Sequence, residues 1–104
     1  MKHDEHLLQV SVVKKLRSKN WIVFAIPNER NQGLADTVRM RSSGVTKGAP
    51  DLVCWDSDGQ CHFMELKTKI GTRSLEQKAI ENVANRLGIK YHLVRDISDV
   101  ERLL

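Results

Sequence analysis

Residues 47–67 read KGAPDLVCWDSDGQCHFMELK, and this stretch decides how the rest of the chain is arranged. Two short runs, at 52–55 and 61–64, are rich in the Val, Cys, Trp and Phe residues that are typical of β-strands. Between them, Ser, Asp and Gly at 57–59 supply turn residues, and the Gly is free to adopt a positive φ. The pattern therefore predicts a β-hairpin.

The length of the hairpin turn decides whether two acidic side chains share one face of the sheet. A two-residue loop would set Asp51 opposite Leu66, whereas a three-residue loop sets it opposite Glu65. Lys67 lies two residues beyond Glu65 and so shares its face in a strand. With the longer loop, two acids and an amine converge at one end of the hairpin, and such a cluster suits a hard divalent cation.

The same residues resemble a known nuclease motif. Pro50-Asp51, thirteen residues, and then Glu65-Leu66-Lys67 look like the PD-(D/E)xK motif of restriction-endonuclease-like nucleases. Flanking residues narrow the resemblance to the VRR-NUC domain, a small family of virus-type replication and repair nucleases, in a stand-alone form. Those residues are Gly44-Val45, Lys47-Gly48-Ala49-Pro50-Asp51-Leu52, Ile26-Pro27-Asn28-Glu29 and Gln77. The resemblance spans nearly the whole chain.

The resemblance implies an α/β fold with a restriction-endonuclease-like core, in which helices flank a central mixed β-sheet in the order α-β-loop-β-β-α-β-α. It also implies a Mg²⁺- or Mn²⁺-dependent, structure-selective DNA endonuclease that hydrolyses phosphodiester bonds. Relatives of this kind act on branched DNA as homodimers, so the substrate could be a Holliday junction.

Several alternatives stay open at this point. Glu and Lys alternate on many solvated strands, so Glu65 and Lys67 could form a structural ion pair. Against this, Met64 and Leu66 indicate a buried strand, where unpaired charges are rare. A second alternative is a catalytically silent DNA-binding module of the same fold, acting in a repair or packaging assembly. Clustered acids argue against that module, because they repel phosphate. A third is an α/β scaffold that binds no DNA.

The resemblance also assigns roles to individual residues. Asp51 and Glu65 bind the metal, the Leu66 carbonyl is a possible further ligand, and Lys67 orients or activates the attacking water. Glu5 is a next-shell candidate, because relatives use a first-helix Glu near the metal. The structural alternative for Glu5 is a first-turn acid that complements the helix dipole.

Gln77 has two possible roles that one residue could combine. It follows Ser74 by three residues, so it completes a capping box at the start of a helix. In relatives, a Gln at this place reaches the active site. The helix start must also lie close to the end of the Lys67 strand.

The connection from 28 to 47 is polar and basic. After Glu29 it contains several Arg and Lys residues but a single acidic residue, Asp36. Its residues 34–40 could form one or two helical turns. A long segment of this kind is often functional, so we expect a phosphate-facing arm, with a merely solvated loop as the alternative. The candidate DNA-binding residues here and after Lys67 are Arg30, Arg39, Arg41, Lys47, Lys69 and Arg73.

The remaining elements are predicted from apolar spacing and caps. They are a helix from Asp4 to about Lys19, a buried strand at 21–26 that pairs with the hairpin, a helix from Ser74 to Leu87, a strand at 89–94 and a short helix capped by Ser98 and Glu101. The predicted buried face of the helix after Ser74 comprises Leu75, Ala79, Ile80, Val83, Ala84 and Leu87.

Length and composition limit which class of protein this chain can belong to. A chain of 104 residues is expected to form one domain, 1–104, and its net charge of +4 favours polyanionic partners. Cys54 and Cys61 are expected to be reduced core residues, and the four His residues have no zinc-site spacing. The first twenty residues contain no continuous apolar segment. We therefore expect an intracellular, soluble protein, in the cytoplasm of a bacterial or phage-infected cell.

Overall fold

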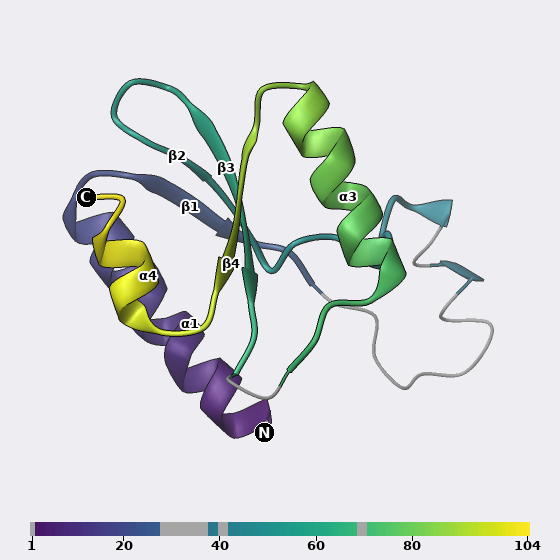
Figure 1. Cartoon of the computed structure of the whole chain (residues 1–104), viewed down its shortest axis with the longest axis horizontal. Helices are drawn as coiled ribbons and strands as arrows, with labels where there is room; N and C mark the ends of the chain where they lie inside the picture. The colour runs from purple at the N-terminus through teal and green to yellow at the C-terminus, as the bar shows by residue number, and fades with distance from the viewer. Residues whose placement is uncertain (1, 28–37, 40–41, 69–70) are drawn as a thin grey trace.

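A computed structural model describes residues 2–27, 38–39, 42–68 and 71–104, in which helices flank both faces of a mixed sheet (Figure 1). Within these residues the strands form one four-stranded sheet with the order β1-β2-β3-β4. The elements are α1 (Lys2–Ser18), β1 (Ile22–Ala25), β2 (Leu52–Trp55), β3 (Cys61–Leu66), α3 (Leu75–Arg86), β4 (Lys90–Val94) and α4 (Ile97–Glu101). The predicted fold class and element order are confirmed.

Strand directions follow from the connections. The pairs β1–β2 and β2–β3 are antiparallel, whereas β3 and β4 are parallel because α3 forms the crossover between them. The helical turns predicted at 34–40 lie outside the described residues, except that Val38 and Arg39 have a helical backbone.

The hairpin turn has the predicted length of three residues. The Asp56 amide donates to the Gln60 carbonyl at 3.0 Å, and the Gly59 amide donates back to the Asp56 carbonyl at 3.0 Å. The carboxylate of Asp56 also accepts from the amides of Asp58 and Gln60. Gly59 adopts a φ of 84°, which closes the loop in the left-handed region that favours glycine.

The hydrophobic core lies between the sheet and the two helices α1 and α4. Alternate residues of β2, β3 and β4 point into it, and α1 contributes Val12 and Leu16 at helical spacing. The buried core residues are Val12, Leu16, Trp21, Val23, Leu52, Cys54, Met64, Leu66, Val94 and Val100. Both cysteines are free thiols; Cys54 is buried and Cys61 is half-buried.

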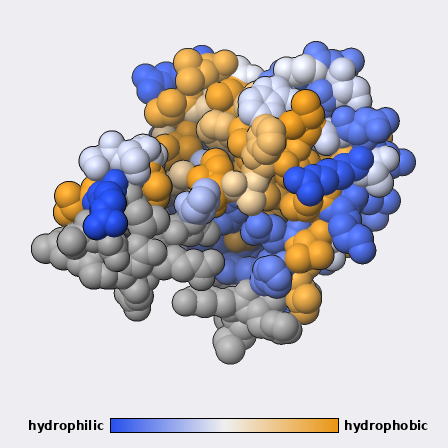
Figure 2. All heavy atoms as spheres, turned by 180° about the vertical axis from the view of Figure 1, so that it is seen from behind, coloured by the Kyte–Doolittle hydropathy of each residue, from blue (hydrophilic) through white to orange (hydrophobic). Residues whose placement is uncertain are grey.

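The opposite face of the sheet is covered less completely than the sequence predicts. The predicted buried face of α3 is wrong, because only Ala84 is buried, while Leu75 is 82% and Leu87 is 70% exposed. The helix packs on β4 and leaves the β1 side of the sheet open. On β1, only Val23 is buried, whereas Phe24 is 56% exposed, so the predicted buried strand is also wrong there. Figure 2 shows hydrophobic side chains across the middle of this face.

Two helix starts differ from those predicted. Helix α1 begins at Lys2, so Asp4 lies in its first turn and does not cap it. Helix α4 is capped by Asp96 in a capping box with Asp99, two residues earlier than the predicted Ser98 box. The Asp99 carboxylate accepts from the Asp96 amide at 3.2 Å, and this bond starts the helix directly after β4. None of the described helices is long and apolar enough to cross a membrane.

Candidate active site

The site is built at the open end of the β2–β3 hairpin. The last paired residues are Leu52 and Met64, so one further step sets Asp51 across from Glu65, as predicted. Hydrogen-bonded pairs alternate along an antiparallel ladder, and Asp56 and Gln60 form one such pair. Asp51 and Glu65 lie five positions along the ladder from that pair, so they occupy a non-hydrogen-bonded position. Opposed Cα atoms in such a position are only about 4.5 Å apart. The two carboxyl groups are therefore neighbours on one face.

Hydrogen bonds at both ends hold Asp51 in this position. Its carbonyl accepts from the Ile26 amide at 2.9 Å, which extends the pairing of β1 with β2 by one residue. Its side-chain Oδ2 accepts from the Leu66 amide at 2.7 Å. The Asp51 carboxylate thus accepts the hydrogen bond of a β3 amide, one residue before β2 begins.

Glu65 is the most strongly perturbed carboxyl group of the site. It is only 3% exposed, and burial, followed by the charge of Asp51, raises its pKa to about 8. Lys67 opposes this rise in pKa, whereas Glu5 adds to it. One oxygen, Oε1, is buried and accepts no hydrogen bond from the residues that the structure describes. The environment therefore disfavours a bare carboxylate and favours one that is paired with a cation.

Gln77 completes the predicted capping box and also contacts Glu65. Its backbone amide donates to the Ser74 side-chain hydroxyl at 3.1 Å, and its side-chain oxygen accepts from the Ser74 amide at 2.8 Å. Its side-chain nitrogen donates to Glu65 Oε2 at 2.7 Å. The capping box therefore fixes the rotamer that places the Gln77 side chain on Glu65.

Lys67 and Glu5 lie near enough to Glu65 to shift its pKa in opposite directions. The Lys67 amide donates to the Val94 carbonyl at 3.0 Å, so the backbone continues the β3–β4 ladder beyond the strand end. Its side chain packs over Gly71, where an added Cβ would lie 3.2 Å from Lys67 Cδ. The structure thus brings together Asp51, Glu65, Lys67, Gln77 and Glu5.

The donor atoms fit a hard divalent cation. Among residues 2–27, 38–39, 42–68 and 71–104, no group of three or more His, Cys, Asp or Glu side chains is placed to hold a metal ion. The open end of the hairpin offers a pair of acidic donors, Asp51 and Glu65. Mg²⁺ is commonly held by one or two carboxylates and completes its shell with water and substrate phosphate. The buried Glu65 Oε1, which accepts no hydrogen bond within the described part of the chain, fits such a ligand position.

The structure describes three of the six candidate DNA-binding residues, Arg39, Lys47 and Arg73. Arg39 is exposed, and Lys47 Nζ lies 3.8 Å from Glu76 Oε2 in an exposed ion pair. The Arg73 guanidinium is bound by Glu81 and lies 5.8 Å from the centroid of the Tyr91 ring, so a phosphate would compete with these partners. The predicted contacts of Arg30, Arg41 and Lys69 lie outside the described residues.

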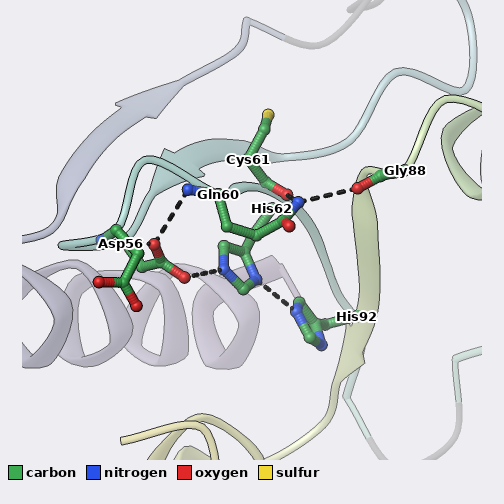
Figure 3. Close-up of polar contacts among 7 residues, drawn as sticks. Asp56, Gln60, Cys61, His62, Gly88 and His92 are labelled. Carbon is green, nitrogen blue, oxygen red and sulfur yellow. Dashed lines mark hydrogen bonds and ion pairs between the residues drawn. The ribbon is translucent and has the colours of Figure 1, made fainter.

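A buried polar chain on the other face of the sheet was not predicted (Figure 3). His62 Nε2 lies 2.9 Å from Asp56 Oδ2, and His62 Nδ1 lies 2.9 Å from His92 Nε2. Burial, with added effects of His62 and Lys90, lowers the pKa of His92 to about 4, and the bond to His62 lowers the pKa of Asp56. Nothing in their spacing along the chain brings the two histidines together; only the parallel register of β3 and β4 does.

No protein-family model and no curated protein matches the sequence. Comparison with solved structures finds a chain described as a VRR_NUC domain, with a TM-score of 0.69. The match covers 95% of this chain and 91% of that chain, at 17% sequence identity. At this identity the likeness concerns the fold alone. The chain therefore has the fold of a VRR_NUC domain, as the resemblance in its sequence implies.

Proposed function

We propose that this protein is a nuclease that uses Mg²⁺ or Mn²⁺ to hydrolyse phosphodiester bonds in DNA. The observation that carries the proposal is the pair of adjacent carboxyl groups, one of which has a buried oxygen without a hydrogen-bond donor among the described residues. The fold of a VRR_NUC domain supports the same activity. A purely structural ion pair of Glu65 with Lys67 would leave the neighbouring Asp51 unexplained, because burial and the charge of Asp51 both oppose ionisation of Glu65.

In this proposal Asp51 and Glu65 hold the cation, with the Leu66 carbonyl as a further ligand. When bound, the cation offsets the charge of the phosphate and favours deprotonation of a water molecule. Lys67 contributes an ammonium group that orients the attacking water. Gln77 holds Glu65 Oε2 by its amide, so that Oε1 is presented to the site.

Glu5 acts on the site through its charge. It lies at the start of α1 and raises the pKa of Glu65, so it adds to the negative field at the hairpin end. A stronger negative field favours cation binding and opposes the approach of a bare phosphate. Glu5 therefore makes productive DNA binding more dependent on the metal.

The test is cleavage of labelled four-way junction, flap, splayed-arm and linear duplex DNA, each with Mg²⁺, Mn²⁺ or EDTA. We expect cleavage that needs a divalent cation and is abolished by Asp51→Asn. The alternative, a silent DNA-binding module, predicts salt-sensitive binding to these substrates without cleavage under any metal condition. Absence of both binding at low salt and cleavage would refute both and leave a scaffold protein.

We further propose that the active form is a homodimer that cuts branched DNA, with a four-way junction as the test substrate. Two symmetric nicks need two active sites, and a two-fold dimer supplies them. The surface that supports this is the open sheet face, which comprises Ile22, Phe24, Val53, Trp55 and Phe63 (Figure 2). Exposed apolar areas of this kind often mark protein–protein contacts.

The free edge of β1 is less suited to such a contact than the face. Asp51 and Ile26 form a hydrogen-bonded pair, so Val23 directs its carbonyl away from β2. That carbonyl accepts from Arg17 Nη2 at 2.9 Å. A charged side chain thus occupies the edge, which discourages pairing with another strand.

Light scattering with size-exclusion chromatography tests the dimer. Phe24→Glu should yield a folded monomer that nicks the two strands of a junction independently. Leu7→Glu is the matched control, because Leu7 is 52% exposed on α1, which covers the other face of the sheet. A parent that is monomeric, or a Phe24→Glu variant that stays dimeric, would refute the proposed interface.

A further inference from the structure

Gly48 contacts the first turn of α3 through its backbone. It has a φ of 88°, and a Cβ added there would lie 2.7 Å from both the carbonyl carbon and the Cβ of Glu76, and 2.9 Å from the Gln77 nitrogen. Real Cβ atoms essentially never approach other atoms this closely, and two of the three atoms belong to the helix backbone. Only glycine therefore fits between this loop and α3.

Neighbouring residues reinforce the contact. The Ala49 amide donates to the Thr46 carbonyl at 3.1 Å, which closes a tight turn around Gly48. Lys47 Nζ lies 3.8 Å from Glu76 Oε2, on the same helical turn that Gly48 touches. The loop that leads into Asp51 is thus held against the start of α3 by main-chain packing and by an ion pair.

Few other contacts hold the first turn of α3. The residue of α3 that is buried, Ala84, lies in its last turn, whereas Leu75 in the first turn is 82% exposed. The capping box orders the turn internally but does not attach it to the sheet. The attachment comes from Gly48, from the ion pair of Lys47 with Glu76 and from the bond between Gln77 and Glu65.

We propose that Gly48 is a positioning residue for the active site. Two residues separate it from Asp51, and its contact sets the position of the α3 backbone at Gln77. Gly48 therefore fixes the spacing between Asp51 on β2 and the Gln77 amide, with Glu65 held between them. This inference rests on the proposed nuclease function, but the contact and its effect on Gln77 are measurable without DNA or metal.

Gly48→Ala tests the contact, and two other glycines provide matched controls. Gly59 and Gly88 also have positive φ values, of 84° and 77°, but an added Cβ at either position meets nothing within 4 Å. Gly59→Ala and Gly88→Ala therefore introduce the same backbone strain without the clash. Any effect specific to Gly48→Ala reports the contact with α3.

The first readout is amide hydrogen exchange of the metal-free proteins. In Gly48→Ala, exchange at the 76–78 amides should rise at least tenfold relative to the parent, whereas Gly59→Ala and Gly88→Ala should stay within about threefold. Equal exchange in all three variants would overturn the inference. If Gly48→Ala does not fold while both controls do, Glu76→Ala, which removes the Lys47 ion pair, should raise exchange at these amides at least threefold. An unchanged rate in that variant would also overturn it.

The second readout is the kinetics of DNA cleavage. Gly48→Ala should lower kcat at least tenfold with KM within about threefold of the parent, and Gly59→Ala should change neither by more than threefold. If Gly48 acts through Gln77, adding Gly48→Ala to a Gln77→Ala background should cost less than threefold more. Additive losses would contradict positioning through Gln77. A parent that cuts no DNA refutes the proposed function, whereas a cutting parent with unaffected Gly48→Ala refutes only this inference.

Discussion

Replacing Glu65 by Gln should stabilise the metal-free protein by an amount that grows with pH. Glu65 is buried beside Asp51, and its pKa rises from 4.5 to about 8 in the folded state. The pKa of Glu65 is higher in the folded state than in the unfolded state. Protonated Glu65 therefore stabilises the folded protein fully below pH 4.5, and this stabilisation is lost as the pH rises through 8. Glutamine keeps the size and the acceptor for Gln77 without the charge.

The magnitude follows from the size of the shift. A shift of roughly 3.5 pKa units corresponds to at most about 5 kcal/mol of unfolding free energy, reached above pH 8. Structural relaxation and water penetration around the charged Glu65 carboxylate reduce this upper bound. We therefore expect the stability difference between variant and parent to be near zero at pH 5 and about 2–3 kcal/mol at pH 9.

Urea unfolding in EDTA at intervals from pH 5 to pH 9 measures this difference directly. Glu101→Gln is the control, because Glu101 is an exposed carboxylate at the end of α4 and its ion pair with Lys15, at 3.9 Å, is an exposed one of the kind that contributes little to stability. A difference between Glu65→Gln and the parent that does not vary with pH would refute the reasoning. Added Mg²⁺ should raise the melting temperature of the parent and change that of Glu65→Gln much less.

Three further predictions concern other residues. In EDTA, Asp51→Asn should melt no lower than the parent and bind DNA at least as tightly, yet lose cleavage; unfolding, or cutting at the parent's rate, would contradict a metal-ligand role. The pKa of His92 falls from 6.5 to about 4 on folding, so stability should decline as the pH falls from 6.5 towards 4, and His92→Gln should flatten that decline in urea titrations. Lys47→Ala should lower the slope of log K against log salt by about 0.9 if Lys47 contacts a phosphate, and an unchanged slope would exclude that contact.

The hairpin and its acidic pair were predictable because local chemistry determines their register. Ser, Asp and Gly at 57–59 specify the loop length, and the alternation along each strand then sets Asp51 across from Glu65. Gln77 was predictable for a related reason, since the capping box specifies where the helix starts. In each case residues close in sequence determine a local geometry.

The errors arose where packing between distant elements decides the outcome. The spacing of Leu75, Val83 and Leu87 identifies an apolar side of α3 but not whether another element covers it. The contact between His62 and His92 depends on the parallel pairing of β3 and β4, which no spacing along the chain encodes. At α4, two possible caps stand two residues apart, and the end of β4 decides between them.

The parallel pairing of β3 with β4 also has a consequence for the order of folding. The hairpin joins residues close in sequence, whereas β4 can pair with β3 only after the crossover through α3 has closed, so we expect the hairpin to form first. Asp51 and Glu65 then meet before Gln77 arrives with α3, and their repulsion acts on the folding transition state. Glu65→Gln should therefore speed refolding at pH 9 and leave the unfolding rate nearly unchanged, a signature that stopped-flow kinetics resolves.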